Sequence, residues 1–265
     1  MDKDTFSKLK VADIKALFET EQALEILPLA QEDTRSSVQK LAASYIKHRE
    51  KELKEQQRRM SMYDYEGMFY DQGIYHVAGV DEVGRGPIAG PVTVAAVILP
   101  PMTLIPCLND SKKLTEEKRE ALYDIIMEEA VAVSCISYGP DKIDELNIYE
   151  ATRQAMYEAI RTLSVPAEAV VADAMKLPDL TIPVESIIKG DSKSANIAAA
   201  SIIAKVTRDR YMKQLDEEYP GYGFGIHKGY YTELHKEAVE QQGVTPLHRK
   251  SFEPIKSIVR WVKPE

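Results

Sequence analysis

The spacing of hydrophobic and polar residues changes near residue 74. Before that point, apolar residues recur at the interval that places them on one face of a helix: Val38, Leu41, Ala42, Tyr45 and Ile46. The segment 63–73, rich in Tyr, Asp and Gly, is typical of a linker. We therefore predict a helical N-terminal extension over residues 1–73 and a second domain over residues 74–265.

Beyond residue 74 the pattern first becomes typical of strands. Apolar runs at 79–82, 92–99 and 131–138 are short enough to be strands, and Gly90-Pro91 turns the first run into the second. These three runs predict an antiparallel meander.

Helices and strands alternate after the meander. Residues 147–163 repeat apolar positions at helical spacing, and the short apolar run 169–172 follows them. A further strand is expected at 183–189, before a long helix from Ser192 to about Asp216. The predicted fold is therefore of the α/β class: a mixed five-stranded sheet flanked by helices, with more helices beyond Pro220.

Composition excludes several classes of protein. The longest apolar stretch, 91–102, is too short to span a bilayer, and the N-terminus lacks a signal-peptide pattern, so we expect a cytoplasmic protein without membrane contact. The two cysteines, Cys107 and Cys135, lie outside any C-x-x-C spacing, and the five histidines are dispersed. Neither a disulfide framework nor a zinc site is indicated.

Charge is uneven along the chain. The formal net charge of −8 argues against a nucleic-acid partner, but from Arg35 to Met60 eight Lys or Arg stand against three Glu. Within this segment a basic stripe lies on one face of the predicted helix, formed by Lys40, Lys47, Lys51, Lys54 and Arg58. Two interpretations stay open for it: a solvated helix face, or contact with a nucleic-acid backbone.

Four acids stand where predicted elements end. Asp81 and Glu82 close the first strand and lead into a glycine-rich segment, Asp173 ends a strand, and Asp191 precedes a helix. Taken singly, these could be turn residues, a loop acid and an N-cap. Taken together they would form an oxygen-ligand cluster suited to Mg²⁺ or Mn²⁺.

Such a cluster predicts phosphodiester hydrolysis. Two ions roughly 3.5–4 Å apart could bridge a scissile phosphate, with one activating water and the other stabilising the leaving oxygen. Neighbouring strand residues point to opposite faces, so Asp81 and Glu82 can share the site only if Glu82 lies past the strand end. A dinucleotide-binding interpretation of Gly84-Arg85-Gly86 is weak, because Pro87 and Pro91 follow where a helix should begin.

Several motifs together resemble those of bacterial ribonuclease HII, in that family's order and spacing over roughly residues 74–250. They are Gly79-Val80-Asp81-Glu82-Val83-Gly84-Arg85-Gly86-Pro87, Asp110-Ser111-Lys112-Lys113-Leu114, Ala172-Asp173-Ala174, Gly190-Asp191-Ser192-Lys193-Ser194 and Gly223-Phe224-Gly225-Ile226-His227-Lys228-Gly229-Tyr230. The resemblance implies the ribonuclease H-like fold and an enzyme that cuts the RNA strand of RNA–DNA hybrids. It also implies incision on the 5′ side of single ribonucleotides in DNA, leaving 3′-hydroxyl and 5′-phosphate ends.

The resemblance assigns roles to further residues. Gly84, Arg85 and Gly86 match the segment that contacts the ribonucleotide 2′-hydroxyl, the group that distinguishes RNA from DNA. Tyr230 matches the tyrosine that stacks on the deoxyribose beyond the junction. Four residues of two Asp-Ser-Lys tripeptides carry donors suited to phosphate oxygens: Ser111, Lys112, Ser192 and Lys193.

Two alternatives remain beside this interpretation. Ribonuclease HIII shares fold and metal chemistry, but Arg85 between two glycines and a helical rather than β-rich N-terminal region argue against it. A catalytically silent nucleic-acid-binding module is disfavoured because all four acids are present. We expect a monomeric enzyme that uses Mg²⁺ or Mn²⁺, with two ions when substrate is bound.

Overall fold

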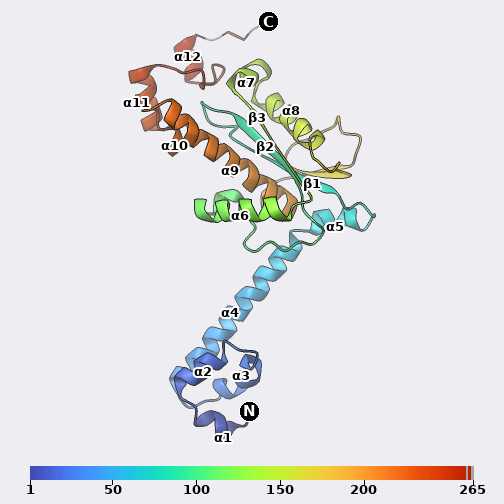
Figure 1. The fold of residues 1–265 in the computed structure, drawn as a ribbon, viewed down its shortest axis with the longest axis vertical. Helices are drawn as coiled ribbons and strands as arrows, with labels where there is room; N and C mark the ends of the chain where they lie inside the picture. The colour runs from blue at the N-terminus through green and yellow to red at the C-terminus, as the bar shows by residue number, and fades with distance from the viewer. Residues whose placement is uncertain (261, 264–265) are drawn as a thin grey trace. The chain divides into compact units, whose positions relative to one another are not determined.

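The computed structural model describes residues 1–260, 262 and 263, and the chain divides into two compact units, Met1–Arg58 and Arg59–Glu265 (Figure 1). Residues 59–73 therefore pack with the second unit. Each unit has a hydrophobic core of its own.

The first unit is helical, as the sequence predicts. It comprises α1 (Lys3–Ser7), α2 (Val11–Leu17), α3 (Ala23–Gln31) and most of α4 (Ser36–Ser61). Val38 and Ala42 of the predicted apolar face are fully buried against Phe6, Ile14 and Ile26. Leu41 packs partly buried against the same core, whereas Tyr45 and Ile46 of the predicted face are half-buried and are not part of it.

The second unit is built on a five-stranded sheet of order β3-β2-β1-β4-β5. Its strands are β1 (Val77–Val83), β2 (Val92–Ile98), β3 (Ala132–Tyr138), β4 (Ala169–Asp173) and β5 (Val184–Ile187). The predicted antiparallel meander is confirmed, because β2 pairs antiparallel with both β1 and β3. β4 pairs parallel with β1 and with β5, which makes the sheet mixed.

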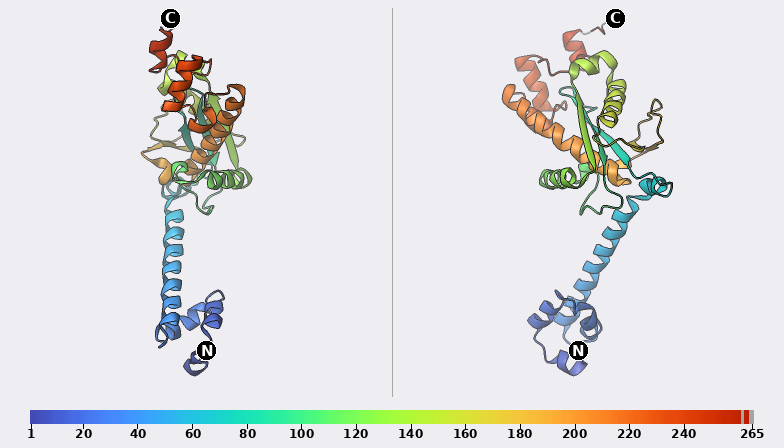
Figure 2. Two further views of the ribbon diagram at one scale, coloured as in Figure 1. Left: turned by 90° about the vertical axis from the view of Figure 1, so that its left-hand side faces the viewer. Right: turned by 45° about the vertical axis from the view of Figure 1, so that its right-hand side comes forward.

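Helices cover both faces of the sheet (Figure 2). Alternate residues of β2 face opposite cores: Ala95 and Val97 pack toward α9 (Ala195–Glu218), and Val94 and Ala96 toward α8 (Ile148–Arg161). Every residue of β2 is consequently buried. The continuous apolar run of β2 reflects this two-sided burial.

Helix α9 approaches β1 closely, and Gly79 makes this possible. A Cβ placed on Gly79 would lie 2.0 Å from the carbonyl carbon of Asn196. Only glycine fits there. The Asn196 side chain also donates to the carbonyl oxygen of Val77 at 2.6 Å, which fixes the start of α9 against the strand that carries Asp81.

Shorter helices surround this framework. They are α5 (Asp64–Tyr70), η1 (Ser111–Lys113), α6 (Glu116–Glu129), α7 (Pro140–Leu146), η2 (Gly190–Ser192), α10 (Phe224–His227), α11 (Glu233–Gln242) and α12 (Ile255–Val259). The last three confirm the expected helices beyond Pro220. Within the described residues, no helix has the length and apolar character needed to cross a membrane.

The segment 63–73 differs from the linker that its composition suggests. Residues 64–70 form α5, and its Glu66 is fully buried. The Glu66 carboxylate accepts hydrogen bonds from the Ser194 hydroxyl at 2.6 Å and from the Asn196 backbone N–H at 3.0 Å. Tertiary contacts with the first turn of α9 therefore order a stretch that its polar composition alone would leave loose.

Candidate active site

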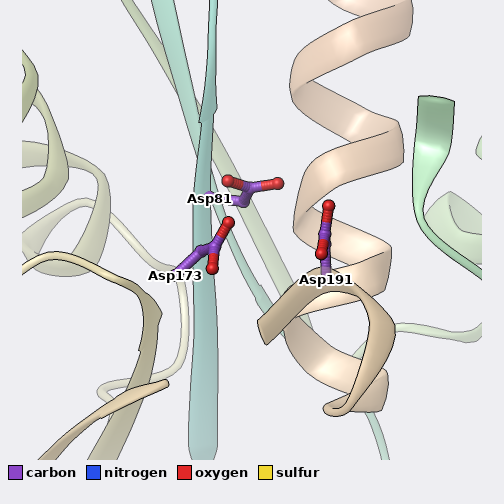
Figure 3. Close-up of side chains that lie close together, drawn as sticks. All are labelled: Asp81, Asp173 and Asp191. Carbon is purple, nitrogen blue, oxygen red and sulfur yellow. The ribbon is translucent and has the colours of Figure 1, made fainter. Parts of the chain in front are cut away.

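Three carboxylates meet at one edge of the sheet (Figure 3). Asp81 lies on β1, Asp173 is the last residue of the parallel neighbour β4, and Asp191 lies on η2, just before α9. Each offers an oxygen that lies within 4.8 Å of those of the other two. Ser194, rather than Asp191, caps α9, since its hydroxyl accepts from the Ile197 N–H at 3.1 Å. The N-cap alternative for Asp191 is therefore wrong.

The repulsion among these three carboxylates favours a bound cation. Burial raises the pKa of Asp81 well above its usual range, and the charges of Glu82 and Asp173 raise it further. Burial also raises the pKa of Asp191, together with repulsion from Asp110 and Asp173. Three carboxylates this close cannot all ionise at neutral pH without a compensating charge. A hard divalent ion fits this donor set, because it supplies that charge and prefers oxygen ligands.

Glu82 stands beside this group rather than in it. β1 continues to Val83 and Glu82 pairs with Val94, so Glu82 is still a strand residue. Its carboxylate lies 3.2 Å from the Arg85 guanidinium, and its Oε2 is buried without a hydrogen-bond partner among the described residues. Burial raises the pKa of Glu82, and Arg85 partly offsets this effect. Because neighbouring strand residues point to opposite faces, the strand keeps Glu82 out of the three-acid group, and its Oε2 is an unpartnered buried acceptor among the described residues.

A cleft of about 490 Å³ opens beside Asp173 and Asp191. Its remaining lining residues are Asp110, Lys112, Lys113, Ala174, Ile188, Lys189 and Ser192. Asp110 is a further acid at the site, and it does not stand at the end of a predicted strand. Its position as the first residue of an Asp-Ser-Lys tripeptide, parallel to Asp191, was the available signal.

The four expected phosphate contacts lie in different surroundings. The exposed Lys112 places its Nζ 3.7 Å from Asp191 Oδ2, at the mouth of the cleft. The Ser111 hydroxyl is buried and shares a hydrogen bond of 2.9 Å with Ser201. Ser192 donates to the Lys189 carbonyl at 2.9 Å, and the Lys193 side chain is exposed.

The glycine segment after β1 reaches the protein surface at Arg85 and Gly86. Gly84 has φ +87°, a conformation that other residues rarely adopt, and it turns the chain out of the strand. Arg85 and Gly86 are exposed, whereas residues 87–91 are buried. A Cβ placed on Gly86 would lie 3.5 Å from Cε1 of Tyr230, whose ring is 49% exposed. The structure thus brings the glycine segment and Tyr230 together from positions far apart in sequence.

The sheet order, the two-sided helical cover and the acids at adjacent strand ends define a protein with the ribonuclease H-type fold. The crystal structure of ribonuclease H2 from Pyrococcus horikoshii OT3 has this fold and aligns with a TM-score of 0.61 at 27% identity, covering 69% of this chain and 97% of that one. Ribonuclease HII in its PCNA complex from Archaeoglobus fulgidus aligns with a TM-score of 0.54 at 26% identity, covering 67% and 95%.

Sequence comparison shows to which family of this fold the chain belongs. The family model for ribonuclease HII matches residues 78–255, and that for the ribonuclease HII N-terminal domain matches residues 10–70. A ribonuclease HII of Bacillus cereus is 54% identical over 228 residues, which cover 86% of this chain and 88% of that protein. The chain belongs to the ribonuclease HII family, and it is an endoribonuclease of the type 2 ribonuclease H class, which acts on RNA–DNA hybrids.

Proposed function

We propose that this endoribonuclease is metal-dependent and incises duplex DNA on the 5′ side of a single embedded ribonucleotide, leaving 3′-hydroxyl and 5′-phosphate ends, besides cutting the RNA strand of hybrids. The observation that carries the proposal is the convergence of Asp81, Asp173 and Asp191 within 4.8 Å. Asp81 and Asp191 are buried and Asp173 is half-buried, and carboxylates gathered this closely are typical of a site that holds cations for phosphoryl transfer.

The proposed cofactor is Mg²⁺ or Mn²⁺, with two ions when substrate is bound. Asp81, Asp173 and Asp191 would hold them, with the free Oε2 of Glu82 within the same buried region. When bound, such ions activate water and stabilise charge on the leaving oxygen. A neighbour of the same fold, ribonuclease HIII from Bst, was crystallised with Mn²⁺; at 22% identity and a TM-score of 0.50 it supports the fold only.

The residues of this chain would select and orient the substrate. Gly84 turns the chain so that Arg85 and Gly86 are exposed beside the acids, where the backbone of this segment can contact a 2′-hydroxyl closely. Tyr230 presents a half-exposed ring next to Gly86, available for stacking on a sugar. Lys112 places a cation at the cleft, where it can bind a phosphate oxygen.

A nicking assay tests the proposal. A duplex with one ribonucleotide should be cut at its 5′ side in Mg²⁺ or Mn²⁺, whereas an all-DNA duplex of the same sequence stays intact. EDTA should abolish cutting and fresh Mg²⁺ should restore it, because the acid cluster requires a cation. Equal cutting of the all-DNA duplex would refute selection by the 2′-hydroxyl, and cutting in EDTA would refute metal dependence. Absence of any cutting would favour a catalytically silent binding module.

A further inference from the structure

Two buried arginines pack against the glycine segment and its continuation to Pro91. Arg208 comes from α9 and Arg249 from the segment between α11 and α12. Their exposed fractions are 1% and 0%. Lysine and arginine are rarely buried this completely unless each donor has a partner, so the partners of these two indicate their role.

Arg249 binds the carbonyl oxygens of the glycine segment. Its Nη2 donates to Gly84 at 2.5 Å and to Gly90 at 3.0 Å, its Nη1 to Arg85 at 2.9 Å, and its Nε to Gly90 at 3.0 Å. The planar guanidinium group thereby binds three carbonyls at once. Two of them, those of Gly84 and Arg85, precede the buried residues 87–89, and that of Gly90 follows them. The ring of Phe252 lies against the guanidinium, with 5.0 Å from Cζ to the ring centre.

Arg208 continues the same arrangement along the loop. Its Nε donates to the Pro91 carbonyl at 2.8 Å, and its Nη2 to the Ala89 carbonyl at 3.3 Å. Together the two guanidinium groups bind carbonyls of five residues in the segment 84–91. Among the described residues, neither arginine forms an ion pair within 4.0 Å of a carboxylate.

Burying two cations without carboxylate partners carries a large desolvation free energy. Two apolar side chains of similar volume would stabilise the core without that penalty. Burial and the charge of Arg208 lower the pKa of Arg249 to about 9, which still leaves it protonated at neutral pH. The arrangement is therefore better explained by control of the loop conformation than by stability alone.

The bonded carbonyls determine where the backbone N–H groups point. In a trans peptide the C=O and the following N–H point in opposite directions. Because Arg249 draws the Gly84 and Arg85 carbonyls inward, the N–H groups of Arg85 and Gly86 must point away from it, on the exposed side of the loop. Within the described part of the chain these two N–H groups have no hydrogen-bond acceptor.

We propose that Arg249, assisted by Arg208, is a positioning residue for ribonucleotide selection: it sets the peptides of Gly84 and Arg85 so that the N–H groups of Arg85 and Gly86 face the substrate 2′-oxygen. The inference rests on the proposed function, in which this segment contacts the 2′-hydroxyl. Arg249 itself touches no substrate. A lysine at position 249 would keep the charge, but its single ammonium nitrogen cannot replace the three nitrogens with which Arg249 reaches the carbonyls of Gly84, Arg85 and Gly90.

The test compares binding of two duplexes in Ca²⁺, chosen to limit turnover: one with a single ribonucleotide and one all-DNA. The parent should prefer the first, and Arg249→Lys should reduce that preference by about tenfold, the value of one or two lost hydrogen bonds. The Kd for all-DNA should stay unchanged. Arg208→Lys should reduce the preference less, since Arg208 donates to the Pro91 and Ala89 carbonyls and not to those of Gly84 or Arg85.

Asp144→Ala is the matched control. The Asp144 carboxylate accepts from the backbone N–H groups of Lys250 and Ser251 at 2.9 Å each, so it anchors the segment next to Arg249 without touching the loop. The control should lower the thermal midpoint and leave the preference intact. Equal loss of preference in Asp144→Ala and Arg249→Lys would overturn the proposal, as would full preference in Arg249→Lys.

The two possible failures are distinguishable. A parent that binds both duplexes equally contradicts the proposed function itself, whatever the variants do. A parent that discriminates, with an Arg249→Lys variant that discriminates equally well, contradicts only the role of Arg249. If circular dichroism shows that Arg249→Lys is unfolded, Arg208→Lys decides: a preserved preference there overturns the inference, and a reduced one supports it.

Discussion

Asp173 and Gly190 are joined by a hydrogen bond of 2.8 Å, in which the Gly190 backbone N–H donates to Asp173 Oδ1. The bond ties the end of β4 to η2, the turn that carries Asp191. One carboxylate of the acid cluster therefore also fixes the position of another. Asp173 has two separable properties, an acceptor oxygen and a negative charge.

An amide at position 173 should keep the acceptor oxygen and remove the negative charge. Asp173→Asn keeps an oxygen that can accept from Gly190, so the thermal midpoint should stay within a few degrees of the parent. It loses the charge that would hold a cation, so cleavage should fall by more than about a hundredfold. Asp173→Ala should lose cleavage and also lower the midpoint. Near-normal turnover of Asp173→Asn would show that Asp173 is no ligand.

Tyr230 is expected to affect single-ribonucleotide incision more than stability. Tyr230 is 49% exposed and lies beside Gly86, so little core packing is lost on truncation. A stacked ring contributes about 1–3 kcal/mol in nucleic-acid contacts, so Tyr230→Ala should lower kcat/KM by roughly ten- to hundredfold. Tyr231→Ala is the control, since Tyr231 is the next residue and is 45% exposed. Equal effects of the two variants would contradict a stacking role for Tyr230.

The basic stripe of α4 gives a third prediction, that the N-terminal unit assists substrate binding. Lys47, Lys51 and Lys54 are exposed, and within the described residues no ion pair uses them, whereas Arg58 pairs with Glu55 at 2.7 Å. Reversing the three lysines to Glu should weaken hybrid binding and flatten its salt dependence, because each phosphate neutralised contributes about −0.9 to the slope of log K against log salt.

The control for this charge reversal carries the same change elsewhere on the unit. Lys8, Lys10 and Lys15 are also exposed in the first unit, so their reversal to Glu alters net charge equally. The control should keep the parent's salt slope, and the metal requirement should be unchanged in both variants. Indistinguishable slopes for the stripe variant and the parent would mean that the stripe is a solvated helix face.

The sequence predicts local features of this protein better than contacts between distant segments. The strand runs, the long helix after Ser192 and the acids at strand ends follow from periodicity and from residue type. Arg249 shows the limit: it lies 159 positions from the Gly90 carbonyl that it binds, and nothing in its neighbourhood marks it as buried. Glu66 is similar, since only tertiary contact with α9 explains a buried carboxylate in a polar segment.

The histidines show the same limit. Their spacing in the sequence suggests no site, yet His227, His235 and His248 pack together around Phe224. The rings of His227 and His235 stack at 4.3 Å, and the Nε2 atoms of His235 and His248 lie 3.1 Å apart. His248 Nδ1 accepts from the Thr245 N–H at 2.9 Å, so its Nε2–H donates to His235. This pattern requires neutral rings.

Acid should therefore destabilise the second unit through these histidines. Burial lowers the pKa of both His235 and His248 to about 4 in the folded protein, against about 6.5 when unfolded. Between these values only the unfolded chain takes up the protons. Their contribution to stability is thus complete above pH 6.5 and is lost as the pH falls toward 4, at up to about 1.4 kcal/mol per pH unit for each histidine.

The measurement is the free energy of unfolding in urea at several pH values from about 7.5 to about 4.5, for the parent and for His248→Gln. The variant lacks one of the protonating groups, so its stability should fall less steeply with acid, even if it is less stable at neutral pH. Burial raises the pKa values of the acids Asp81 and Asp191, which affects the pH dependence of stability in the opposite direction, but this effect is common to both proteins. The difference between the two curves therefore isolates His248. Parallel curves would show that this histidine is not held neutral in the folded protein.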